Sequence, residues 1–366
     1  MKFDIAVLPG DGIGPEVITE GVKVLQSAGK KFDHEFTLEY GLLGGISIDK
    51  NGVALTEETL KMCRHCDAVL LGAVGGPKWD DPKAKVRPED GLLGVRKGLG
   101  LFANLRPVKN FPALVNATNF KPEVVKGVDM VVVRELTGGL YFGKPKKQWK
   151  TSLGRRAVDT MAYSEKEIER ILRVGFELAR ARKKKLVSVD KANVLQTSRL
   201  WRQIAIELSV QYPDVALEHM LVDSFSMKLI QDPRYVDVAV TENMFGDILT
   251  DEALTLAGST GMVPSASLAG VPVGGKGIFG LYEPIHGSAP TIAGKNIANP
   301  LATILSVAMM LRYSLALSAE AKAIEASVEA ALNGGCRTFD IMSEGKIKMG
   351  TKEMGDVIVK GLPGGR

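Results

Sequence analysis

Short apolar runs alternate with longer segments of helical periodicity along the chain. Residues 5–8, 68–71, 130–133, 186–189 and 236–240 form runs typical of buried strands. Helical patterns begin at Pro15 and Ser164 and occupy residues 56–66 and 88–97. This alternation predicts an α/β fold with much parallel sheet.

Several predicted helices carry start signals. Ser164 and Glu167 have the spacing of a capping box, and Pro15 suits a first helical position. Thr197 and Ser198 are both candidates for the N-cap of the next helix. Two segments interrupt the pattern: residues 270–280 predict a glycine-rich loop, and the lysine-rich residues 144–156 predict a projecting loop or arm.

The first strand is followed by a glycine-rich turn, residues 9–16, with the sequence PGDGIGPE. The Rossmann fingerprint G-x-G-x-x-G fails here, because Gly14 is followed by Pro15 and the third glycine is missing. A proline where the helix must pack closely on the strand predicts another tight turn, so we expect no Rossmann fold. The glycines suit unusual backbone dihedrals as well as a ligand contact.

Composition and charge narrow the class of protein. With 366 residues, 45% hydrophobic and 24% charged, the chain is typical of a globular protein of about two domains. The net charge of +5 suits acidic small molecules, but it is dispersed, which argues against a nucleic-acid partner. No apolar run reaches membrane-spanning length, and the start is too short for a secretory signal. We therefore expect a cytoplasmic protein without a membrane partner.

The three cysteines do not indicate a disulfide framework. Cys63 and Cys66 form one C-x-x-C at the end of a helical pattern, no second such motif exists, and Cys336 is distant in sequence. Buried thiols are a better interpretation than a zinc or redox site.

Two acidic residues stand out in the segment TENMFGDILTDEA, residues 241–253. Asp247 and Asp251 lie four apart on one face of a predicted helix, so they repel unless a cation lies between them. Carboxylate oxygens suit Mg²⁺ or Mn²⁺, and Asp223 is a candidate third ligand. The spacing alone is equally typical of a solvated helix face.

Opposite charge is available near predicted strand or helix ends from Arg96, Arg106 and Arg134. Arginine forks bind carboxylates in bidentate fashion, although a single arginine is more typical of a surface ion pair. Lys191 and Tyr141 follow apolar strands and are candidates for a base and an acid.

Together these segments resemble the metal-dependent β-decarboxylating dehydrogenases of the isocitrate/isopropylmalate type. The matching motifs run in order along nearly the whole chain: LPGDGIGPE, LLGAVGGPKWD, FANLRPV, VRELTGGLYFG, VSVDKANVL, FGDILTDEA and EPIHGSAPTIAGKNIANP. The resemblance implies a two-domain open α/β fold around a cleft. Residues 1–101 plus 258–366 would form the first, cofactor-binding domain, and residues 102–257 the second, with the dimer interface, the metal ligands and an intersubunit arm at 144–156.

The resemblance also implies residue roles. Arg96, Arg106 and Arg134 match the clamps for two substrate carboxylates; Asp223, Asp247 and Asp251 match metal ligands, Asp223 also meeting the substrate. Lys191 and Asp223 match residues from the neighbouring subunit, which implies a homodimer with shared sites. The implied cofactor is NAD, and its segment comprises Glu283, His286, Gly287, Ser288, Ala289, Thr291, Ile292 and Asn299.

The implied reaction oxidises a substituted malate and then removes its β-carboxylate as carbon dioxide. Lys191 would accept the hydroxyl proton as hydride leaves C2 for the nicotinamide, and Tyr141 would protonate the enolate carbon. Mg²⁺ or Mn²⁺ would act as a Lewis acid on the new ketone.

The third substituent of malate would meet Glu89, Leu92 and Leu93. The two leucines also suit core positions of an amphipathic helix. The resemblance implies more: in the isopropylmalate-type members the pattern E-x-x-L-L-x-x-R contacts the isopropyl group, whereas isocitrate-type members carry polar groups there to meet a third carboxylate. The expected substrate is therefore isopropylmalate, in leucine biosynthesis. The alternative substrates are D-malate or tartrate and homoisocitrate. The alternative without enzyme activity is a dinucleotide-binding or nucleic-acid-binding protein, and the complete set of Arg, Lys, Tyr and Asp residues argues against it.

Thr291 departs from the family pattern. NAD-linked members carry an aspartate there, which binds the adenosine ribose and repels the 2′-phosphate of NADP. NADP-linked members place a lysine and a tyrosine at the positions of Thr291 and Ile292, and neither is present here. We expect a preference for NAD with measurable use of NADP.

Overall fold

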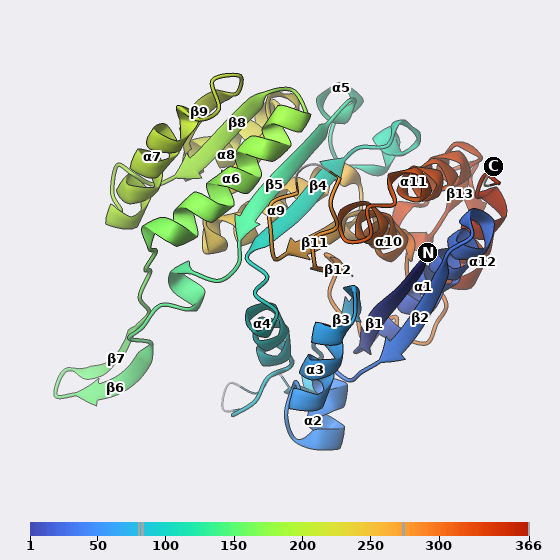
Figure 1. The fold of residues 1–366 in the computed structure, drawn as a ribbon, viewed down its shortest axis with the longest axis horizontal. Helices are drawn as coiled ribbons and strands as arrows, with labels where there is room; N and C mark the ends of the chain where they lie inside the picture. Colours follow the sequence, from blue (N-terminus) through green and yellow to red (C-terminus); the bar gives the residue numbers. More distant parts are fainter. Residues whose placement is uncertain (80, 82–83, 273–274, 365–366) are drawn as a thin grey trace.

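The computed structural model describes residues 1–79, 81, 84–272 and 275–364. Among these residues, ten strands form one mixed sheet in the order β2-β1-β3-β12-β11-β4-β5-β10-β8-β9 (Figure 1). Its strands are β1 (Lys2–Gly10), β2 (Glu35–Tyr40), β3 (Ala68–Ala73), β4 (Ala103–Lys109), β5 (Asp129–Glu135), β8 (Lys185–Asp190), β9 (Ala216–Leu221), β10 (Val238–Thr241), β11 (Pro264–Leu268) and β12 (Gly280–Pro284). The short strands β13 (Cys336–Arg337) and β14 (Ile347–Lys348) pair separately.

Helices cover both faces of this sheet. In Figure 1, α6 crosses in front of the strands and α8 lies behind them. The helices are α1 (Gly14–Phe32), α2 (Gly45–Asn51), α3 (Glu57–His65), α4 (Pro88–Gly98), α5 (Pro122–Val125), α6 (Glu165–Ala181), α7 (Gln196–Ser209), α8 (Val222–Gln231), α9 (Asn243–Leu254), α10 (Leu301–Tyr313), α11 (Ser318–Asn333) and α12 (Thr351–Gly361).

Most local predictions are confirmed, and two are corrected. The capping box at the start of α6 is present, since Ser164 N–H donates to Glu167 Oε2 at 2.8 Å. However, α7 begins at Gln196, and neither Thr197 nor Ser198 caps it. Ser198 Oγ instead accepts from the N–H of Lys191. The strand predicted from residue 236 starts at Val238.

The two ends of the chain build one half of the sheet. Strands β2, β1, β3, β12 and β11 come from residues before 101 or after 258, and α1 contacts α10, α11 and α12. The other half, β4, β5, β10, β8 and β9, comes from the middle of the chain. The halves join where β11 pairs antiparallel with β4. The division of the chain into two domains remains a prediction.

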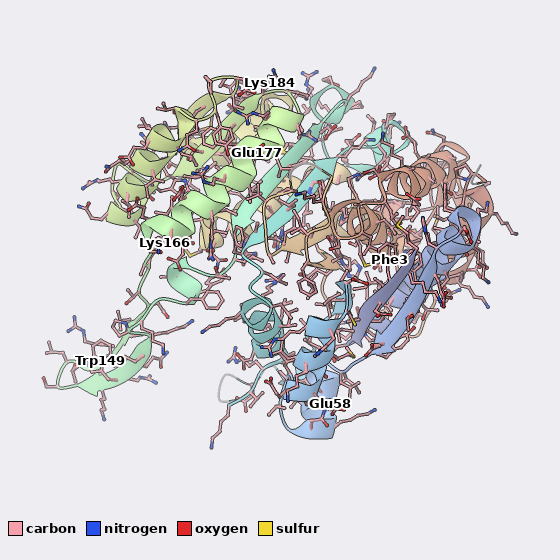
Figure 2. The ribbon with its side chains drawn as sticks, viewed as in Figure 1. Phe3, Glu58, Trp149, Lys166, Glu177 and Lys184 are labelled. Atoms are coloured by element: carbon pink, nitrogen blue, oxygen red, sulfur yellow. The ribbon has the colours of Figure 1, made fainter. Side chains whose placement is uncertain are left out.

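The predicted arm is a hairpin of β6 (Lys147–Thr151) and β7 (Gly154–Val158). It projects away from the rest of the chain, with Trp149 in the middle of the hairpin (Figure 2). Leu153 at the turn is 96% exposed. The glycine-rich loop at 270–280 carries no strand before Gly280 among its described residues, and positions 273 and 274 lie outside them.

The cysteine interpretation is confirmed. All three thiols are buried and free. Burial raises the pKa of Cys63 to about 12 and that of Cys66 to about 11, so neither is a ready thiolate. In the part of the chain that the structure describes, no helix has the length and apolar content needed to cross a bilayer.

Candidate active site

A cavity of about 330 Å³ lies where the two halves of the sheet meet. Helix α4 lines it from one side, β4, β5 and α9 line it from the other, and the end of β12 closes it. The predicted site residues that it brings together are Glu89, Leu92, Leu93, Arg96, Arg106, Arg134, Tyr141, Asp247, Glu283, His286 and Gly287.

Strand geometry explains why two of the arginines meet. Arg106 lies opposite Val132 and Arg134 lies opposite Asn104 in the antiparallel pair β4 and β5, so Asn104, Arg106 and Arg134 point to one face. All three are buried. Burial, together with the charge of Arg134, lowers the pKa of Arg106 to about 10. Burial also lowers the pKa of Arg134, and the charge of Asp247 offsets only part of this effect.

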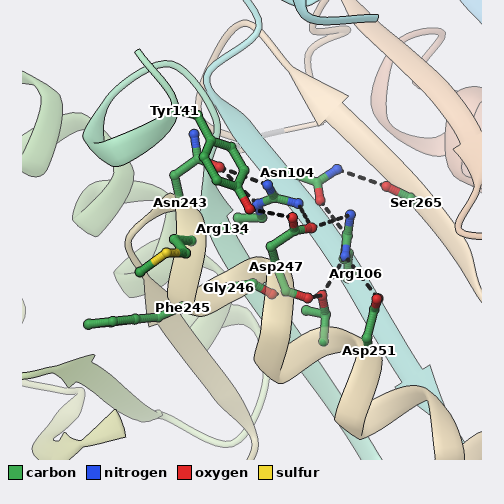
Figure 3. Close-up of polar contacts among 12 residues, drawn as sticks. Asn104, Arg106, Arg134, Tyr141, Asn243, Phe245, Gly246, Asp247, Asp251 and Ser265 are labelled. Carbon is green, nitrogen blue, oxygen red and sulfur yellow. Dashed lines mark hydrogen bonds and ion pairs between the residues drawn. The ribbon is translucent and has the colours of Figure 1, made fainter. Parts of the chain in front are cut away.

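Helix α9 supplies the opposing carboxylates (Figure 3). Glu242 caps it by accepting from the N–H groups of Met244 and Phe245. The helix then presents Asp247 to both arginines: it accepts a hydrogen bond from Arg134 and lies 3.8 Å from Arg106. Asp251, one turn later, lies 3.8 Å from Arg106.

Tyr141 points at the same carboxylate. Its hydroxyl donates to Asp247 Oδ2 at 2.8 Å. Burial, and then the bond to Asp247, raise the pKa of Tyr141 to about 12. The phenol is therefore protonated at neutral pH and can act as a proton donor.

The predicted metal ligands are only partly assembled. Asp247 and Asp251 share a helix face, but Asp223 binds Lys191, with 2.5 Å between Lys191 Nζ and Asp223 Oδ1. Within residues 1–79, 81, 84–272 and 275–364, no three acidic, cysteine or histidine side chains are close enough to hold a metal. Burial raises the pKa of Asp251, although 71% of its side chain is exposed. These two carboxylates fit a hard dication whose other ligands come from outside this cluster.

Lys191 and Asp223 do not line the cavity within the described part of one chain. The hydrogen bond from Lys191 is the main cause that lowers the pKa of Asp223. The pair lies at the ends of β8 and β9, on the second half of the sheet.

Helix α4 contributes the third arginine and the apolar wall. Arg96 Nη2 donates to Glu283 Oε1 at 2.7 Å, and both side chains are buried. Leu92 and Leu93, one turn earlier, are half-buried in the same cavity. An apolar surface therefore stands beside the arginine cluster.

The predicted cofactor segment is held by the glycine-rich turn after β1. Ile13 N–H donates to the carbonyl of Ser288 at 2.8 Å. A Cβ on Gly12, which has a φ of +57°, would lie 2.0 Å from that carbonyl, so only glycine permits this approach. His286 Nε2 is buried without a hydrogen-bond partner among the described residues, and burial lowers the pKa of His286.

The remaining residues of the segment lie away from the cavity lining. Ala289 has a positive φ of 38°, Thr291 is exposed and Ile292 is half-buried. Asn299 Nδ2 donates to Asp340 at 3.0 Å, and its Oδ1 accepts from the N–H of Leu301 at the start of α10.

Sequence reasoning missed the polar groups that hold the arginines. Asn243 Oδ1 accepts from Arg134 Nη2 at 2.8 Å, and Asn104 Oδ1 accepts from Arg106 Nε at 2.7 Å. A signal was available, because Asn243 precedes Asp247 by one helical turn and Asn104 precedes Arg106 on the same strand face.

A cleft in a mixed α/β sheet, where buried arginines face carboxylates of a helix, is a suitable site for a small polycarboxylic acid. The family model described as isocitrate/isopropylmalate dehydrogenase matches residues 4–358. The chain belongs to this family, and it is accordingly an oxidatively decarboxylating dehydrogenase. The predicted family and the predicted fold are both confirmed.

Individual relatives agree with this assignment. The chain is 66% identical to the 3-isopropylmalate dehydrogenase of Dehalococcoides mccartyi, with 100% of both chains covered. It is 58% identical to the enzyme of that name from Carboxydothermus hydrogenoformans, covering 99% of this chain and 96% of the other. Among solved structures, isocitrate dehydrogenase from Methylococcus capsulatus superimposes with a TM-score of 0.85 at 33% identity, covering 98% and 99%.

Proposed function

We propose that this protein oxidises and decarboxylates 3-isopropylmalate to 4-methyl-2-oxopentanoate with reduction of NAD, a step of leucine biosynthesis. The observation that carries the proposal is the placement of Leu92 and Leu93 in one cavity with Arg96, Arg106 and Arg134. A substrate with two carboxylates and one branched apolar group fits this cavity, because the arginines can bind the carboxylates and the leucines can contact the apolar group. The full-length relatives of the same name support the same substrate.

The chain's own residues then have distinct tasks. The arginine cluster holds the two substrate carboxylates, whose charge compensates the buried cations. Tyr141 donates a proton to the carbon that loses carbon dioxide, and Lys191 accepts the hydroxyl proton. Bound NAD would supply the hydride acceptor, and Mg²⁺ or Mn²⁺ at Asp247 and Asp251 would supply a Lewis acid. The two sheet halves are the proposed domains, 1–101 plus 258–366 and 102–257.

A homodimer with shared sites completes the proposal. Lys191 and Asp223 lie outside the cavity that holds the arginines, so a second copy is the proposed source of both groups at each site. The apolar side chains exposed on α8 and α9 support this arrangement: Met227 is 57%, Ile230 40% and Ile248 62% exposed. Burying such a cluster between two copies favours association.

The function is tested by steady-state assays with 3-isopropylmalate, D-malate, isocitrate and homoisocitrate, each with Mg²⁺ or Mn²⁺ and NAD. We expect the highest kcat/KM with 3-isopropylmalate. A higher value with any of the other three acids would contradict the proposed substrate.

Shared sites are tested by subunit exchange. Lys191→Ala and Asp247→Asn proteins are each expected to be folded and inactive, since both residues are assigned to chemistry. In a mixed dimer, one site receives both intact residues, so part of the activity should return after exchange. Exchange demonstrated by native mass spectrometry without recovery of activity would argue against sharing.

The cofactor preference is tested at Thr291. We expect kcat/KM to favour NAD in the wild type, and Thr291→Asp to sharpen that preference, because a carboxylate both binds the ribose diol and repels the 2′-phosphate. Thr291→Asn, which adds no charge, is the control. A wild-type ratio in favour of NADP would show the cofactor assignment to be wrong.

A further inference from the structure

The loop that carries Lys191 is fixed at several points of its backbone. Lys191 N–H donates to Ser198 Oγ at 3.0 Å, and the carbonyl of Lys191 accepts from the N–H of Leu195 at 2.9 Å. Ala192 N–H donates to Asp190 Oδ1 at 2.9 Å. The loop is therefore held on both sides of Lys191, although loops at strand ends are commonly mobile.

Asp190 makes the last of these contacts and also binds the next helix. It is the last residue of β8 and is 1% exposed. Its two oxygens accept from Arg202 Nε and Nη2, each at 2.8 Å, in a bidentate ion pair. Arg202 belongs to α7, so the pair ties the end of β8 to the helix after the loop.

Stability alone is a weak explanation for this pair. The desolvation of a buried ion pair often offsets its attraction, so apolar residues of similar volume serve a core as well. His219 adds no competing cation, because burial, and then the charge of Arg202, lower the pKa of His219. The partners of Asp190 are therefore the guanidinium of Arg202 and the N–H of Ala192 in the loop.

We propose that Asp190 and Arg202 form a positioning pair, which fixes the backbone from which Lys191 reaches the reacting atoms of the shared site. The inference rests on the proposed role of Lys191 as the base. The long lysine side chain reaches its target only if its Cα is fixed, and a misplacement of about 1 Å can lower a rate about a hundredfold.

The chain offers a closely matched control in Asp237. This carboxylate is 2% exposed, accepts from Arg182 Nε at 2.8 Å and accepts from the N–H of Lys183 at 2.8 Å. It precedes β10, the strand beside β8, and therefore lies at the opposite end of the sheet. Asp237 has the same chemistry and burial as Asp190 but holds no residue of the proposed site.

The experiment compares full-length Asp190→Asn and Asp237→Asn with the wild type at saturating Mg²⁺ and NAD. Both variants should lower the Tm. Only Asp190→Asn should lower kcat for 3-isopropylmalate, by about ten- to a hundredfold, with KM within about twofold. Deuterium at C2 of the substrate should slow kcat more in Asp190→Asn than in the wild type. Arg202→Lys, which keeps the charge but loses the fork, should give an intermediate kcat.

Each result decides between the alternatives. A kcat of Asp190→Asn equal to that of Asp237→Asn overturns the positioning role. If Asp190→Asn does not fold, a wild-type kcat of Arg202→Lys overturns it instead. Normal turnover of Lys191→Ala would overturn the proposed role of Lys191, and the positioning pair with it. The two failures are therefore distinguishable.

Discussion

The two faces of the strand pair β4 and β5 hold arginines in different surroundings. Arg106 and Arg134 point to the face that holds the candidate active site, and the pKa of each is lowered. On the other face, a second cavity of about 330 Å³ is lined by the half-buried Arg182 and Arg312. Burial lowers their pKa values too, but hydrogen bonds and nearby acids outweigh it, so both values are raised.

The difference lies in the partners. Arg182 is bound to Asp129 and Asp237, and Arg312 forms a bidentate pair with Glu325. On the active-site face, Asp247 faces two arginines and also accepts from Tyr141. On the second face, each arginine has a close carboxylate partner from the protein itself. On the active-site face, Arg106 lies 3.8 Å from both Asp247 and Asp251, so its guanidinium is available to a carboxylate of the substrate in a pre-formed site.

The largest expected effect tests the active-site face. Because the pKa of Arg134 is lowered, the folded protein binds this proton less tightly than the unfolded chain, so the charge costs stability at neutral pH. Arg134→Met should therefore change the free energy of unfolding by less than about 1 kcal/mol. It should lower kcat/KM for 3-isopropylmalate about a thousandfold, or about 4 kcal/mol. Denaturant unfolding and steady-state kinetics measure both, and a large loss of stability would refute this view of the cluster.

The opposite face should give the reverse result. Arg182→Met leaves the buried Asp237 without its cation, and the free energy of unfolding should fall by about 3 kcal/mol. The kcat/KM should stay within about twofold, since Arg182 touches no residue of the proposed site. Unfolding in urea checks the first expectation, and the steady-state assay checks the second. A hundredfold loss of activity in a folded variant would contradict the assignment of this face to stability alone.

The smallest expected effect separates the apolar wall from the arginines. Replacing Leu92 and Leu93 by serine should weaken the use of 3-isopropylmalate by about 2 kcal/mol, or some tens-fold in kcat/KM, and leave D-malate almost unchanged. Only the isopropyl group needs an apolar surface. The ratio of kcat/KM values for the two acids is the measurement, and equal losses for both would remove the leucines from substrate recognition.

Local sequence patterns predicted most helices and strands, but they did not predict contacts between residues far apart in the sequence. The strands and the capping box at Ser164 follow from residues a few positions apart. The shared face of Asp247 and Asp251 follows in the same way. The bond between Arg134 and Asn243 depends instead on strand order, because it joins β5 to the helix after β10. The predicted cap at Ser198 was wrong because its hydroxyl accepts a hydrogen bond from the N–H of Lys191. Rules for helix starts consider only neighbouring residues and do not include such a tertiary contact.

The sheet half made from both chain ends has a consequence for biosynthesis. Strand β3 gains its neighbour β12, and α1 gains α10, α11 and α12, only when the last part of the chain leaves the ribosome. The middle segment, with β5, β10, β8 and β9 adjacent to one another, has most of its partners much earlier. The nascent protein must therefore hold its first-made strands with an open edge while its middle folds. A ribosome that stops shortly before α12 releases a chain whose earliest helix lacks one of its three partner helices, so a late truncation exposes a surface made at the start of synthesis.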